Sequence, residues 1–196
     1  MDEQKLIQRS IEGDTRAFNE LILAYQGLAF SVAYRTLHNS DAAADAVQDS
    51  FLKAFRALHT FEGGNFKAWL LRIVTNTCYD VLRSWKRRPT DSLEDLPVDQ
   101  DYVPHLVDSA EAPEQFAERM ELNELIERGI QTLPPDQQIV MVLCDIHGCS
   151  YEEIAEITGA AMGTVKSRIS RARGKLRDYL YQHPELLPAT YRPNGG

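Results

Sequence analysis

Basic side chains gather in two short stretches of this 196-residue chain, although its net charge is −8. Residues 66–88 hold six Lys and Arg residues against one acidic residue, and residues 166–177 hold six against none. Clustered cations can bind phosphate groups, so both stretches are candidate contacts for nucleic acid. Two solvated helix faces would give the same charge pattern, and charge alone leaves both interpretations open.

The negative charge is also concentrated. Residues 90–124 contain eleven acidic residues and one basic residue, a local charge of −10, so the rest of the chain sums to +2. The stretch 89–113 also holds four prolines and shows little hydrophobic periodicity. This composition is typical of a flexible acidic linker. It would join two small domains, residues 1–88 and 114–182, and a tail would follow over 183–196.

The apolar residues recur at helical spacing, and the period-2 alternation of a strand is nearly absent, so we predict an all-α fold. Hydrophobic residues make up 43% of the chain, as in ordinary globular proteins. No apolar run approaches the ~20 residues of a membrane span, and the polar N-terminus is unlike a signal peptide. Three irregularly spaced cysteines fit a reducing compartment. We therefore expect a cytoplasmic protein without direct membrane insertion.

Turn and cap signals divide the N-terminal domain into helices. Gly13 and Asp14 end a first helix and cap a second segment that carries Phe18 to Tyr25. A further helix runs through residues 28–37, and others are expected over 42–58 and 67–86, separated by a glycine loop.

The C-terminal domain carries the pattern of two helices joined by a tight turn. Ser150 and Glu153 have the spacing of a capping box, which would start a helix ending at Thr158. Gly159 follows where a sharp turn needs a positive φ. A second helix begins near residues 161–163, which gives a helix-turn-helix arrangement.

The faces of this second helix differ in chemistry. Four apolar residues cluster on one side and should face the core: Val165, Ile169, Ala172 and Leu176. The opposite side carries Ser167, Ser170 and Arg171, with cations on both flanks. Such a helix suits the DNA major groove, where its tip would read base edges and its flanks would hold phosphates. A solvated helix would more often alternate acids and bases at i,i+4, so DNA contact is favoured here.

The helix over residues 67–86 is divided in a similar way. Its apolar side includes Cys78, which we expect to be a buried structural thiol, and its other side presents Arg72, Asn76 and Arg83. Phe61 and Phe66 bracket the glycine loop before it, and Trp69 lies in its first turn. Aromatic rings, an amide and cations could together bind unpaired bases. Packing in a small core explains each aromatic ring equally well.

Four motifs together resemble a known family. Residues 41–56 (DAAADAVQDSFLKAFR) resemble the core-polymerase-binding helix of bacterial sigma factors, and residues 66–76 (FKAWLLRIVTN) their promoter-melting segment. Residues 133–138 (LPPDQQ), and 150–157 (SYEEIAEI) with 163–173 (GTVKSRISRAR), resemble their −35-reading domain. The short two-domain layout is similar to the extracytoplasmic-function (ECF) group.

The resemblance implies roles for individual residues. A docking face for core RNA polymerase, on the clamp helices of its largest subunit, would consist of Asp45, Gln48, Asp49 and Leu52. The −10 DNA would meet Phe61, Phe66, Trp69, Arg72, Asn76 and Arg83. The −35 element would be read by Lys166, Ser167, Ser170 and Arg171, flanked by phosphate contacts from Arg168 and Arg173.

The implied function is that of an alternative sigma factor, a promoter-recognition factor and not an enzyme, without cofactor or metal. Its partners would be core RNA polymerase, promoter DNA and an anti-sigma factor, which in this group is often membrane-anchored.

Other functions fit the sequence less well. A sigma-like mimic that only sequesters an anti-sigma factor would not need both basic faces, and a one-component repressor would leave the −10-like half unexplained. Cys144, His147 and Cys149 could suggest a metal or thiol-redox site, but their spacing matches no usual zinc pair. The sequence contains neither a glycine-rich phosphate loop nor a nucleophile elbow, so no such motif indicates an enzyme.

Overall fold

A computed structural model describes residues 2–87 and 113–187, and every regular element in these ranges is helical. The predicted linker 89–113, except for Pro113, and most of the tail predicted over 183–196 therefore lie outside the described residues. The N-terminal half holds α1 (Glu3–Ile11), α2 (Thr15–Leu37), α3 (Ser40–Ala57), the short η1 (Leu58–Thr60) and α4 (Phe66–Arg87). The C-terminal half holds α5 (Pro113–Gln131), α6 (Pro135–Met141), the π-helical turn η2 (Val142–Ile146), α7 (Tyr151–Thr158), α8 (Met162–Leu180) and η3 (Pro184–Leu186). The predicted all-α fold is confirmed.

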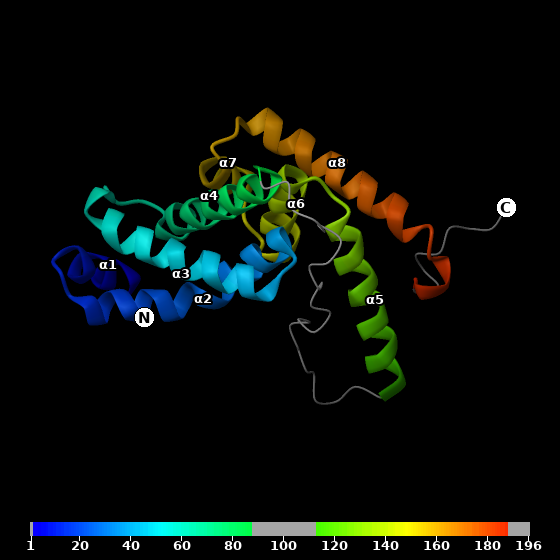
Figure 1. Ribbon diagram of the computed structural model, residues 1–196, viewed down its shortest axis with the longest axis horizontal. Coiled ribbons are helices and arrows are strands. Elements are labelled where there is room, and N and C mark those ends of the chain that lie inside the picture. Colours follow the sequence, from blue (N-terminus) through cyan, green and yellow to red (C-terminus); the bar gives the residue numbers. More distant parts are fainter. Residues whose placement is uncertain (1, 88–112, 188–196) are drawn as a thin grey trace.

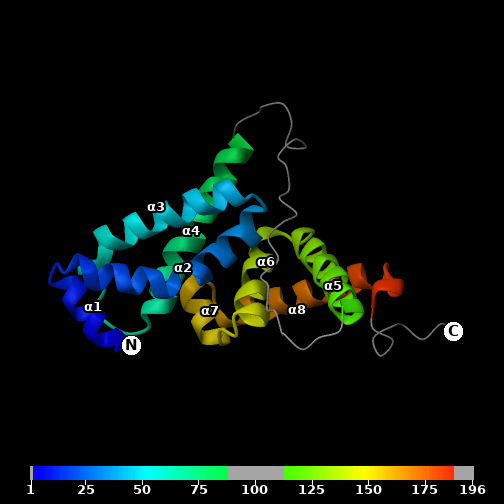
Figure 2. The same cartoon turned by 90° about the horizontal axis from the view of Figure 1, so that it is seen from below.

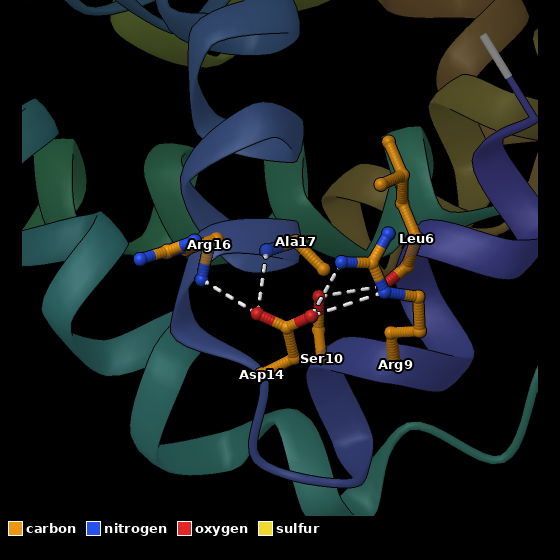
Figure 3. A network of polar contacts seen from close by, with 6 residues as sticks. All are labelled: Leu6, Arg9, Ser10, Asp14, Arg16 and Ala17. Carbon is orange, nitrogen blue, oxygen red and sulfur yellow. Dashed lines mark hydrogen bonds and ion pairs between the residues drawn. The ribbon is translucent and has the colours of Figure 1, made fainter.

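The junction of α1 and α2 is fixed by one carboxylate (Figure 3). Asp14 caps α2, because its Oδ1 accepts hydrogen bonds from the backbone N–H groups of Arg16 and Ala17 at 2.9 and 3.2 Å. Its other oxygen accepts a hydrogen bond from Arg9 Nε at 3.0 Å. The Arg9 hydrogen bond and the capped N–H groups hold the pKa of Asp14 below its usual value. The cap predicted from the sequence is confirmed.

The prediction of two helices between residues 15 and 37 is wrong, because α2 is one continuous helix of 23 residues. Gly27 lies inside it with no left-handed φ, so the backbone continues through the glycine. A glycine costs a helix interior about 1 kcal/mol, which packing on both sides can offset. The chain turns after Leu37 instead, at His38, whose φ of 55° is left-handed.

The two halves pack against each other (Figures 1 and 2). In both views α6 and α7 lie against the N-terminal half, with α7 beside α4 and α6 beside α2. One cluster of buried apolar side chains extends across the boundary, from Val32 of α2 and Val74 of α4 to Val140 of α6 and Ile154 of α7. A second cluster lies wholly in the N-terminal half, around Leu21 and Phe66.

Candidate nucleic-acid and polymerase interfaces

The helix-turn-helix is built as the sequence predicts. The Ser150 side chain accepts a hydrogen bond from the Glu153 backbone N–H at 3.1 Å, and the Glu153 carboxylate accepts one from the Ser150 N–H at 2.8 Å. This capping box starts α7, and Gly159 ends it with a φ of 66°. The chain then enters α8 after Ala161, which offers no side-chain cap.

The orientation of α8 is set by its apolar side. Val165, Ile169, Ala172 and Leu176 are all buried, as predicted. The opposite side therefore faces outward, where Lys166, Ser170 and Arg171 are exposed and Ser167 is half-buried. Among the described residues, no acid forms an ion pair with Lys166 or Arg171, so these cations are available to a polyanion.

The two flanking arginines of α8 are already paired. Arg168 Nε lies 3.0 Å from Asp136 Oδ2, and Arg173 binds both carboxylate oxygens of Asp145, with its Nε 3.1 Å from Oδ2. The hydrogen bond to Asp145 raises the pKa of Arg173 above its usual value. These pairs fix the two guanidinium groups on either side of Ser167 and Ser170. Neither pair was predictable from residue spacing, because Asp136 and Asp145 lie more than 25 positions before the arginines that they contact.

Helix α4 presents the predicted polar face. Arg72, Asn76 and Arg83 are exposed, and Arg83 pairs with Asp80 one turn earlier at 2.7 Å. Cys78, on the other side, is fully buried, and burial raises the pKa of its thiol to about 12. Its prediction as a structural cysteine is confirmed.

The aromatic rings beside this face differ in accessibility. Phe66 is 0% exposed and belongs to the core, where its ring centroid lies 5.6 Å from that of Phe61 and 5.5 Å from that of Trp69. A buried ring cannot stack on a base, so we assign Phe66 a supporting role instead of the predicted DNA contact. Phe61 and Trp69 are half-buried and cover it.

The predicted polymerase-docking face lies on α3. Asp45, Gln48, Asp49 and Leu52 are all exposed, and Asp49 pairs with Lys53 at 2.7 Å. Beside them α2 and α3 enclose an apolar groove of about 780 Å³, which Gln48 and Leu52 also line. Its other apolar walls include Phe18, Ile22, Phe30, Val47, Phe51 and Phe55. Sequence reasoning missed this groove, although Phe55 repeats the apolar character of Leu52 one turn later on the same exposed side.

The three residues that could suggest a metal site form no such cluster. No group of three or more His, Cys, Asp and Glu side chains within residues 2–87 and 113–187 could hold a metal ion. His147 instead contacts Ser31, and Cys149 is 3% exposed. Within residues 2–87 and 113–187, no helix combines the length and the hydrophobicity that a bilayer-spanning segment needs.

Comparison with known proteins covers both halves of the chain. Residues 21–88 match the family described as Sigma-70 region 2, and residues 123–176 match Sigma-70, region 4. The ECF RNA polymerase sigma-E factor of Escherichia coli is 37% identical over 175 residues, which cover 88% of this chain and 91% of that protein. The chain belongs to the ECF sigma factors.

Other relatives agree with this assignment. The RNA polymerase sigma-H factor of Pseudomonas aeruginosa is 38% identical over 174 residues, with 87% of this chain and 90% of that protein covered. The ECF sigma factor SigE of Mycolicibacterium smegmatis is 38% identical over 85% of this chain, which spans 63% of the length of that protein. This ECF sigma factor is accordingly an alternative sigma factor, a transcription initiation factor and not an enzyme.

Solved structures resemble this ECF sigma factor over both halves. CnrH, solved in complex with the cytosolic domain of CnrY, has a TM-score of 0.63 and 27% identity and covers 91% of this chain and 96% of that one. The Bartonella quintana sigma factor RpoE, in complex with the anti-sigma factor NepR, has a TM-score of 0.64 and 29% identity, with 83% and 96% covered.

Proposed function

We propose that this ECF sigma factor docks on the clamp helices of core RNA polymerase through α3. The docking residues are Asp45, Gln48, Asp49 and Leu52, all exposed on one helix. Their acidic character suits a basic protein surface and disfavours DNA, since like charges repel. The apolar groove beside Leu52 adds area that a partner can bury.

The two basic faces take separate parts of a promoter. On α4, the exposed Arg72, Asn76 and Arg83 hold the melted −10 strand, beside the half-buried Phe61 and Trp69. On α8, Lys166, Ser167, Ser170 and Arg171 read the −35 duplex in the major groove, and Arg168 and Arg173 hold phosphates on either side. The observation that carries this function is the exposure of two basic faces and one acidic face on three different helices.

Reconstituted transcription tests this function. Core polymerase plus this protein should start RNA synthesis at specific sites, and neither component should do so alone. A mimic that only occupies an anti-sigma factor would neither bind core polymerase nor support transcription, so that outcome would replace the proposal. The exposure of both basic faces favours the initiation factor over the mimic.

An anti-sigma factor is the second partner that we propose. One solved relative, RpoE, is in complex with the anti-sigma factor NepR, and another, CnrH, is in complex with the cytosolic domain of CnrY. We place the sigma factor in the cytoplasm with its polymerase, and the regulator at the membrane. A membrane protein should co-purify with the tagged factor from detergent-solubilised cells. It should be missing when the membranes are removed before any detergent is added, and this pair of results would support the arrangement.

A further inference from the structure

Helix α8 carries two kinds of cation. Lys166, Arg171 and Lys175 are exposed, and none of them forms an ion pair within residues 2–87 and 113–187. Arg168 and Arg173 are each paired with an aspartate from outside the helix. Their separation of five positions corresponds to about 140° around the helix and roughly 7.5 Å along it. The two arginines therefore lie at opposite edges of the buried stripe of α8.

Both aspartates come from one well-packed segment. Asp136 lies in the first turn of α6, and Asp145 lies in η2, which continues directly from α6. Val140 and Leu143, between them, are 0% exposed, and α6 packs against α8. Close packing leaves such a segment little freedom to move. The two carboxylates are therefore held at fixed positions relative to α8.

The contact to Arg173 fixes the plane of its guanidinium. Nε and Nη2 of Arg173 donate to the two carboxylate oxygens of Asp145, and Nη2 lies 3.6 Å from Cys144 Sγ. A guanidinium has five N–H donors, so both donors of Nη1 stay available to a phosphate. Asp145 lies in a π-helical turn, in which the His147 N–H donates to the Val142 carbonyl at 3.1 Å. Such turns interrupt the register of an α-helix and are frequent at functional sites.

The contact to Arg168 has a single point. Arg168 Nε lies 3.0 Å from Asp136 Oδ2, and the arginine is half-buried. Tyr79 of α4 lies within electrostatic reach of both groups. One contact point restricts the position of a guanidinium but leaves its orientation freer than two points do. Asp145 should therefore hold its arginine more firmly than Asp136 does.

An arginine that is already ordered loses less side-chain freedom when it binds a phosphate. Phosphate contacts also set the register of a protein on the duplex, so the base contacts of α8 depend on them. We propose that Asp136 and Asp145 are positioning residues for −35 recognition. Each holds its arginine, Arg168 or Arg173, ready for a backbone phosphate. The inference rests on the proposed function, because it concerns how α8 reads the −35 duplex.

Electrostatic repulsion alone predicts a different effect of these two carboxylates. A carboxylate near DNA repels phosphates, so its removal should strengthen binding to every duplex of the same length equally. Positioning predicts a loss of preference for the correct sequence, because misplaced phosphate contacts shift α8 against the bases. The ratio of affinities for two duplexes of equal length therefore separates the two effects.

The experiment measures binding of the full-length protein to two labelled duplexes by fluorescence anisotropy. One duplex is enriched from a random-sequence pool by the wild-type protein, and the other has the enriched bases scrambled. Asp145→Asn should reduce the preference about tenfold and Asp136→Asn about threefold, since a freed arginine must be ordered again on DNA. Asp178→Asn is the control, because Asp178 is an exposed acid of α8 that pairs with Arg177, and it should leave the preference unchanged. A wild-type preference in both of the other variants would overturn the proposal.

A double-mutant cycle shows whether Asp145 acts through Arg173. In an Arg173→Ala background, Asp145→Asn should cause no further loss of preference. The same loss in both backgrounds would contradict the positioning role and assign the effect to a change elsewhere in the protein. Thermal melting shows whether each variant is folded. If Asp145→Asn does not fold, Asp136→Asn in an Arg168→Ala background provides the same comparison.

This assay contains no polymerase, so its outcome is separable from that of the proposed function. Failure of the wild-type protein to bind core polymerase would refute the proposed function and leave the measured role of the two aspartates as it is. If the wild-type protein enriches no sequence from the pool, −35 recognition fails, and the positioning role fails with it.

Discussion

Asn65 in the loop before α4 donates a hydrogen bond to Glu153 in the first turn of α7, with 3.0 Å between Nδ2 and Oε1. The same carboxylate completes the capping box of α7. One side chain thus starts the helix-turn-helix and ties it to the loop that we assign to −10 DNA.

Removal of the negative charge of Glu153 should make the stability of the protein depend less on pH. Hydrogen bonds from the Ser150 backbone and Asn65, with Lys67 nearby, hold the pKa of Glu153 below its usual value. A depressed pKa means that the carboxylate stabilises the fold above the pKa of the unfolded chain and loses this effect as pH falls through the folded value. Glu153→Gln should therefore lower the melting temperature at pH 7, and the difference should shrink as the pH falls below the pKa of an ordinary glutamate. Glu156→Gln, at an exposed position of the same helix, is the control.

The packing of the N-terminal half against the C-terminal half should weaken in mild acid. Burial, Arg35 and Lys67 lower the pKa of His147 to about 4, and Glu127 and Glu153 face these two cations. A lowered histidine pKa means that closing expels a proton, so closure is fully favoured above the ordinary value of about 6.5 and is lost progressively toward pH 4. Scattering between pH 7 and 5 should show an increase in radius for the wild type. A His147→Gln protein that expands equally would show that another group is responsible.

Loss of Arg171 should weaken recognition of the −35 element. Arg171 is exposed at the tip of α8, and a base-edge contact of this kind contributes about 1–3 kcal/mol of discrimination. Binding of holoenzyme to wild-type and −35-mutant promoters measures the effect of Arg171→Ala. Arg177→Ala removes an exposed arginine that pairs with Asp178 on the same helix and should change binding little. Unchanged promoter use by Arg171→Ala would remove this residue from the base-reading set.

Polymerase binding should depend on Asp49 and not on its ion pair. Asp49→Ala deletes the carboxylate, whereas Lys53→Ala breaks the same 2.7 Å pair and leaves the carboxylate exposed. We expect Asp49→Ala to weaken binding to core polymerase by about tenfold, or ~1.4 kcal/mol, with −35 recognition intact. Lys53→Ala should bind core polymerase normally in the same pull-down or fluorescence titration. If both substitutions weakened binding to core polymerase equally, the loss would come from a change in α3 and not from the missing docking carboxylate.

A better cap should stabilise α8. Ala161 precedes the helix with an extended backbone but has no side-chain oxygen to accept an N–H. Ser at a helix N-cap is more favourable than Ala by about 0.5–2 kcal/mol, so Ala161→Ser should raise the free energy of unfolding by that amount. Ala161→Gly is the control, because it adds backbone freedom but no side-chain acceptor, so it shows how much of any change is due to the backbone and not to capping. Chemical denaturation measures both, and no gain with Ser would show that the first turn of α8 is already satisfied.

The local features could be predicted from the amino-acid sequence alone. Helical periodicity placed Val165, Ile169, Ala172 and Leu176 in the core, because burial of one stripe orients a helix without reference to distant residues. The caps at Asp14 and Ser150 were predictable for the same reason, since a cap bonds to residues two or three positions away.

Contacts between distant segments of the chain could not be predicted in this way. Ser31 and His147 are 116 positions apart, and neither residue type nor spacing indicates that they touch. The burial of Phe66 and the groove between α2 and α3 likewise depend on how several helices pack. Local patterns fix which face of a helix is apolar, but the neighbour that covers that face is chosen by packing over the whole molecule.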